Sequence, residues 1–190
     1  MTSLSGLFTQ YSSVILATHI FFMVIGMGGA LISDLLFFRF LGDRTISRKE
    51  MEVLSVLKNT VMVALGFILL SGVFLVLPDP NRYLHSSSFL LKMSAVGVLT
   101  INGIALHVFV APYLLRMNFK KKSAHETWRH IAFALGGVSV TSWLTAFFTA
   151  MLKNHISLSF IPLLMFYFLA LICAIISTQL VEKKLKARRG

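Results

Sequence analysis

Four ionisable side chains lie inside long apolar stretches of the chain, where they are the best candidates for chemistry. His19 and Asp34 belong to the first stretch, and Lys92 and His107 belong to the third. Titratable groups are costly to place inside a lipid bilayer, so they mark functional sites by default. In each stretch the two residues are fifteen positions apart, which is about 22 Å along a helix and within about 60° of one face. The spacing predicts two polar layers, an outer one with His19 and Lys92 and an inner one with Asp34 and His107.

Both layers contain the residue type that holds haem iron. Imidazole is the common axial ligand of haem, and helical bundles supply ligands from facing helices. His19 with Lys92 is therefore a candidate cofactor site at the outer layer, and His107 with His130 is a second candidate at the inner layer. His19 and His107 are the candidate iron ligands. Because the layers differ in depth, one haem cannot use both residues without a large tilt of the helices.

The inner layer also contains a candidate path for charge or protons. Asn102 lies in the third stretch near the level of Asp34, and Arg39 lies near the cytoplasmic rim of the first. Asp34, Arg39 and Asn102 are therefore predicted to form an intramembrane charge or proton relay.

Each polar residue also has a simple structural explanation. An intramembrane His can serve only as a hydrogen-bonded packing residue, and Lys92 can extend to the outer head groups. Asp34 can neutralise Arg39 or Lys58. These alternatives remain open at the level of the sequence.

The elements that must position these side chains are transmembrane helices. Of 190 residues, 56% are hydrophobic and only 13% are charged, and the mean hydropathy is +0.80. A water-soluble domain could not bury that much apolar surface, and five apolar blocks occupy almost the whole length. We therefore predict an all-α, polytopic transmembrane helical bundle that forms a single integral membrane domain over residues 1–190. The five spans cover about 11–40, 54–77, 88–115, 131–152 and 158–181.

The distribution of Lys and Arg predicts the orientation. Fifteen of the eighteen basic residues flank the first and third connections or follow the last span, and Arg82 and Lys153 flank the opposite side. The positive-inside rule then predicts the amino terminus outside and the carboxyl terminus in the cytoplasm. We attribute the formal net charge of +11 to contact with anionic lipids at the cytoplasmic face. Nucleic-acid binding is not expected, since no basic patch is interleaved with exposed aromatic residues. The single Cys173 excludes disulfides and thiolate clusters, and its apolar surroundings predict a buried thiol.

Several short motifs are similar to those of a known group of proteins. Residues 19–29 and 35–38 resemble the first helix of the HemJ and CopD-like family of small bacterial membrane proteins, which has a His near its outer end and a small pair about ten residues later. Residues 70–75 are similar to the second helix, with its terminal Gly. Residues 91–93 and 102–107 resemble the Lys-led third helix. The resemblance covers roughly residues 14–150.

The resemblance implies a helical bundle in the bacterial inner membrane that holds haem b, with His19 as the ligand and Lys92 beside the site. HemJ proteins are associated with protoporphyrinogen oxidation, and CopD proteins with copper uptake or resistance. This chain has Asp34-Leu35 where the HemJ helix has a Pro-Arg pair, and it has no Met-His clusters in the outer connections. These departures weaken the case for either of those activities.

The sequence leaves three functional hypotheses. The first is a haem b-binding membrane protein with a redox or electron-transfer role, served by a redox partner or a second copy of the chain. The second is a small proton- or cation-coupled transporter, although no inverted repeat or discontinuous helix is evident. The third is a non-catalytic assembly subunit whose polar residues only hold helices together.

Overall fold

The computed structural model describes residues 10–40, 47–110, 124–152 and 158–187. Its long helices are α2 (Ser12–Phe40), α3 (Arg48–Val76), α5 (Ser87–Ala105), α7 (Ala124–Met151) and α8 (Phe160–Ala187), with a short α4 (Pro80–Leu84) and a π-helical turn, η2 (Leu106–Val110). The described residues form helices and no strands. Five helical segments are long and apolar enough to cross a membrane. The predicted all-α, five-span fold is therefore confirmed, while the orientation of the termini stays a prediction.

Helix boundaries follow local sequence signals. Ser47 caps α3: its side chain accepts from the Glu50 amide while the Glu50 carboxylate accepts from the Ser47 amide, which satisfies two free donors of the first turn. The helix ends before Pro78, and Asp79 then caps α4 with Pro80 in its first turn. Ser86 caps α5 in the same manner. The caps Ser47 and Ser86 therefore fix the first residues of α3 and α5.

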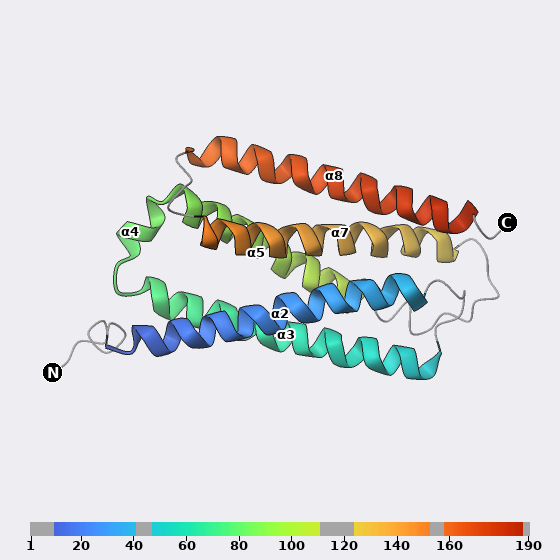
Figure 1. Ribbon diagram of the computed structural model, residues 1–190, viewed down its shortest axis with the longest axis horizontal. Coiled ribbons are helices and arrows are strands. Elements are labelled where there is room, and N and C mark those ends of the chain that lie inside the picture. Colours follow the sequence, from blue (N-terminus) through green and yellow to red (C-terminus); the bar gives the residue numbers. More distant parts are fainter. Residues whose placement is uncertain (1–9, 41–46, 111–123, 153–157, 188–190) are drawn as a thin grey trace.

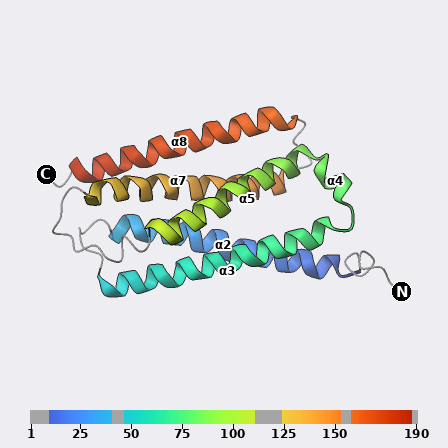
Figure 2. The same cartoon turned by 180° about the vertical axis from the view of Figure 1, so that it is seen from behind.

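The helices form two groups that run alongside each other (Figures 1 and 2). α2 and α3 pack against each other as an antiparallel hairpin, whereas α7 packs between α5 and α8. The short α4 connects the two groups at one end of the molecule. Direct contact between α2 and α7 is much less extensive than the contact within either group.

Each region of contact has its own apolar cluster. Leu91, Ala95, Ala146, Tyr167 and neighbouring side chains fill the space between α5, α7 and α8. A second cluster joins the two groups and consists of Ala30, Leu65, Ile68, Leu99 and Trp143. It is the contact that holds the hairpin to the other three long helices at mid-depth.

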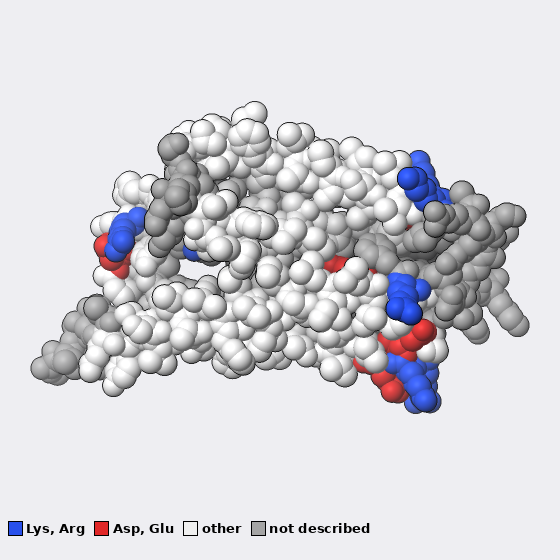
Figure 3. Space-filling model, in the orientation of Figure 1, with Lys and Arg blue, Asp and Glu red and all other residues white. Residues whose placement is uncertain are grey.

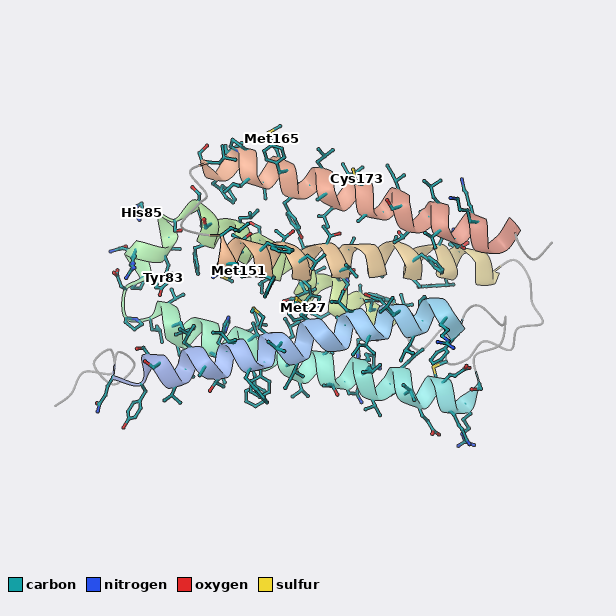
Figure 4. All side chains as sticks on the ribbon, viewed as in Figure 1. Met27, Tyr83, His85, Met151, Met165 and Cys173 are labelled. Atoms are coloured by element: carbon teal, nitrogen blue, oxygen red, sulfur yellow. The ribbon has the colours of Figure 1, made fainter. Side chains whose placement is uncertain are left out.

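The outer surface of the bundle is apolar, as a lipid-facing surface must be. Large side chains such as Phe21, Leu35 and Ile101 are more than half exposed. Charged side chains gather towards the two ends of the molecule, and most of the surface between them is uncharged (Figure 3). Cys173 is exposed on this surface (Figure 4), so the prediction of a buried thiol was wrong.

The third span differs from the regular helix that the sequence predicts. At Leu106 the α-helical pattern gives way to the π-helical turn η2, which continues to Val110. Residues 111–115, the end of the predicted span, lie outside the described residues. The change of pitch occurs beside His107 and widens the helix there.

Candidate functional site

The outer polar layer is centred on His19 of α2. Its ring nitrogen Nδ1 lies 2.9 Å from the hydroxyl oxygen of Ser71 on the adjacent helix α3. Ser71 is buried, and His19 is partly buried. Because α2 and α3 are antiparallel, a residue near the outer end of one helix meets a residue near the end of the other.

The hydroxyl of Ser71 determines the tautomer of the imidazole. Its oxygen lies 2.5 Å from the carbonyl oxygen of Phe67 and 3.2 Å from that of Ile68. Both carbonyls only accept, so the single hydroxyl proton is donated to one of them. Nδ1 of His19 then donates to the Ser71 oxygen, and the His19 ring also has a hydrogen bond with the backbone of Ile68. In the neutral ring this leaves the lone pair on Nε2, the nitrogen that a metal ion would bind.

Lys92 of α5 joins this layer from the other helix group. It lies close enough to His19 for the two side chains to interact electrostatically. Its ammonium nitrogen is also 5.8 Å from the centre of the Phe89 ring. The structure thus brings together the two residues that the depth comparison placed at one level.

The two helix groups do not close completely on each other in this region. The space-filling view shows an opening through the molecule between the α2–α3 hairpin and the other group, towards the end that carries α4, with basic atoms at its rim (Figure 3). Gly72 contributes to the space beside the imidazole, because a Cβ there would lie 3.6 Å from Cε1 of His19. The imidazole of His19 therefore packs against Gly72 as well as against Ser71 of α3.

The inner layer contains Asp34 and Asn102 but does not bring His107 to them. Asn102 is buried and donates from Nδ2 to the carbonyl oxygen of Leu135 at 3.1 Å. Asp34 approaches the next residue of α7, since a Cβ on Gly136 would lie 3.4 Å from its Oδ1. His107 is exposed on η2. Within the described residues no hydrogen bond or ion pair joins it to the other polar groups of the layer.

The remaining predicted members of the inner layer also lie apart from Asp34. Arg39 is exposed and Lys58 is partly buried, and in the part of the chain that the structure describes neither forms an ion pair with Asp34. His130 belongs to a different cluster between α7 and α8. The structure therefore does not assemble the continuous relay from Asp34 through Arg39.

The cluster around His130 contains two residues that sequence analysis did not identify. Nδ1 of His130 contacts a carboxylate oxygen of Glu182 and lies 3.0 Å from Oε1 of Gln179, while Nε2 of Gln179 donates to the His130 carbonyl at 2.9 Å. Glu182 is only 1% exposed. Gln179 and Glu182 are three residues apart and so share one helix face. The three-residue spacing of Gln179 and Glu182 is the sequence feature that could have indicated this cluster.

A groove of about 490 Å³ lies between α5, α7 and α8. Its walls are apolar side chains and threonines, among them Leu91, Thr141, Thr145, Phe148 and Leu163. Of the described residues that line it, Tyr167 alone is titratable. The groove therefore lacks the convergent polar groups of a reactive site.

No group of three or more His, Cys, Asp or Glu side chains that could hold a metal ion is found within the described ranges. A haem iron requires only one or two protein ligands, so a single His remains sufficient for it. No family model, no curated protein and no solved structure matches the chain.

Proposed function

We propose that this multi-pass membrane protein binds haem b through His19 and has a redox or electron-transfer role in the bacterial inner membrane. The observation that carries the proposal is the hydrogen bond from His19 Nδ1 to Ser71, which leaves the lone pair of Nε2 for a metal. Histidines that ligate metals almost always donate their other ring N–H to a neighbouring acceptor.

The surrounding residues suit a flat ligand that carries negative charge. Lys92 supplies a positive charge beside His19, and haem carries carboxylate groups that a positive charge stabilises. Gly72 leaves space beside the ring. When bound, haem would supply one-electron chemistry.

In this proposal the chain's residues position the cofactor and do not react. Ser71 fixes the plane and tautomer of the imidazole, and Lys92 interacts with the anionic groups of the ligand. Attachment is non-covalent, because Cys173 is the only Cys and a C-x-x-C-H motif is absent. A redox partner or a second copy of the chain would exchange the electron, and the basic cytoplasmic ends would contact anionic lipids.

The absorption spectrum of the protein purified in mild detergent tests the proposal. We expect a Soret band after expression with ample haem, and its loss in His19→Ala. His85→Ala is the matched control, because His85 is an exposed residue that caps α4 through the Asn81 carbonyl, and it should keep the band. His107→Ala should also keep it.

Two outcomes would contradict the proposal. A preparation without Soret absorption would favour the transporter or assembly hypotheses over a redox role. A band that survives in His19→Ala but is lost in His107→Ala would instead place the cofactor at the inner level.

A further inference from the structure

The interior of the bundle contains a second polar site that the haem proposal does not use. Asp34 from α2 and Asn102 from α5 both approach α7 at consecutive residues, Gly136 and Leu135. They lie about one helical turn beyond Ala30 and Leu99, which pack together in the cluster between the helix groups. The two side chains therefore belong to one layer of the structure.

This layer has oxygen acceptors without a donor. Oδ2 of Asp34 and Oδ1 of Asn102 are buried, and neither has a hydrogen-bond partner within the described residues. The amide orientation of Asn102 is fixed, because the Leu135 carbonyl can only accept and so must face Nδ2. A carboxylate and an amide oxygen cannot satisfy each other, since both accept. What the layer lacks is a positively charged or donating group.

The protein's own cations do not supply that group. The ion pairs of Arg48 with Glu52 and of His130 with Glu182 do not include Asp34. Of the basic residues expected nearby, Arg39 and His107 are exposed, and Lys58 is partly buried but forms no ion pair with Asp34 in the part of the chain that the structure describes. A carboxylate whose oxygen is buried without a counter-charge is strongly disfavoured in a bilayer, so this layer takes up either a proton or an external cation. The second unpartnered oxygen, Oδ1 of Asn102, favours the cation, which accepts more than one oxygen ligand.

We propose that Asp34 and Asn102 bind a small monovalent cation, Na⁺, between α2, α5 and α7. Oxygen atoms of carboxylates, amides and backbone carbonyls are the ligands that hard cations prefer. One carboxylate neutralises one monovalent charge, whereas a divalent ion would leave a net positive charge inside the bilayer. Gly136 provides the space, because any larger residue would place a side chain against Oδ1 of Asp34. The site shares no residue with the His19 layer, and its test does not depend on haem.

Thermal unfolding in detergent tests the site. The protein is prepared in choline chloride and titrated with NaCl at constant ionic strength. We expect a saturable rise in the apparent Tm of about 3 to 6 °C when Na⁺ is ten times its Kd. Asp34→Asn and Asn102→Leu should abolish the response to Na⁺. Glu52→Gln removes an exposed carboxylate on α3 and should leave that response unchanged.

Fluorescence of Trp143 provides a second measurement in a chain with Asp34 and Asn102 intact. Trp143 packs in the cluster next to the site, and Trp128→Phe removes the other indole. We expect Na⁺, but not choline, to change the emission of Trp143. Equal Tm values in Na⁺ and choline, or a Na⁺ response that persists in Asp34→Asn, would overturn the proposal. A response to pH alone would also overturn it and would identify Asp34 as a site for protons only.

Discussion

One hydroxyl group gives His19 its chemical character. Ser71 is constrained by two backbone carbonyls and can offer the imidazole only a lone pair. The same residue followed by Gly72 forms a small, polar patch on α3 opposite the outer end of α2. In the proposed haem site, the imidazole of His19 would thus be oriented by α3, which carries no proposed ligand of its own.

Removing that hydroxyl should weaken cofactor binding without abolishing it. We expect Ser71→Ala to raise the Kd for haem by about 10- to 100-fold, the usual effect of losing the group that orients a metal-binding His. Ser71→Thr keeps the hydroxyl and should recover most of the affinity. Haem titration followed at the Soret band measures both variants. If Ser71→Ala binds haem as tightly as the wild type, Ser71 does not orient the ligand.

Gly26 is required where the two helix groups meet. A Cβ at this position would lie 2.7 Å from Cη2 of Trp143, which is buried and cannot move freely. We expect Gly26→Ala to lower the free energy of unfolding by about 1–3 kcal/mol, the usual cost of overpacking a well-packed core. Gly28→Ala is the matched control on the same helix, since a Cβ there would contact no neighbouring side chain or helix within 4 Å. Chemical or thermal unfolding in detergent compares the two, and equal stabilities would show that the contact is not tight.

At the scale of the elements, α8 is held to α7 by close backbone packing at mid-length and by polar contacts near its carboxyl end. A Cβ on Gly137 would lie 3.2 Å from the Ala174 carbonyl oxygen, so the two backbones approach closely. Near the carboxyl end, Gln179 and Glu182 both contact His130. Exposed apolar side chains cover most of the remaining surface of α8.

The carboxylate of Glu182 should matter more for stability than its place near the end of a helix suggests. We expect Glu182→Ala to destabilise the protein by about 1–3 kcal/mol, because it removes a fully buried side chain and the carboxylate that His130 of α7 contacts. Glu182→Gln retains an acceptor for His130 and should cost less. Glu52→Ala, at an exposed carboxylate, should change stability by less than about 0.5 kcal/mol. Thermal unfolding of the three variants is the measurement, and a Glu182→Ala variant as stable as Glu52→Ala would contradict this role.

The sequence predicts the elements well and the side-chain partners only in part. The five predicted spans correspond to α2, α3, α5, α7 and α8, and the Pro78 region marks the end of α3. α3 and α7 begin six and seven residues before the predicted spans, because their first turns are polar and hydropathy does not detect them. Depth along the helices also brings His19 near Lys92. Depth does not determine which way a side chain faces.

His107 illustrates what depth alone cannot predict. Asn102 and His107 are five residues apart, about 140° around a helix, so both cannot face the same interior layer. Asn102 is buried and His107 is exposed. The cluster of His130 with Glu182 was missed for a related reason, because it depends on the rotation of α8 relative to α7, which apolar composition does not encode. Neither helix shows a marked apolar face that would have revealed it.

At the scale of the whole molecule, two helix groups meet through one apolar cluster and diverge towards the end that carries α4. The polar layers lie on either side of that cluster, the His19 layer towards α4 and the Asp34 layer about one turn beyond Ala30. An apolar barrier that contains Leu65, Ile68 and Trp143 therefore separates them. The opening in Figure 3 lies in the half where the groups diverge.

The orientation of the whole molecule determines which layer faces which compartment. The distribution of Lys and Arg predicts that α4 is outside and that the start of α3 is cytoplasmic. Single cysteines at Asn81 and Lys49, both exposed residues, test this in a Cys173→Ser background, with Lys120 to Lys122 as further cytoplasmic positions. In intact cells an impermeant thiol reagent should label Asn81→Cys, and Lys49→Cys should react only after the membrane is opened. The reverse pattern would place the His19 layer towards the cytoplasm, and its redox partner would then have to be a cytoplasmic one.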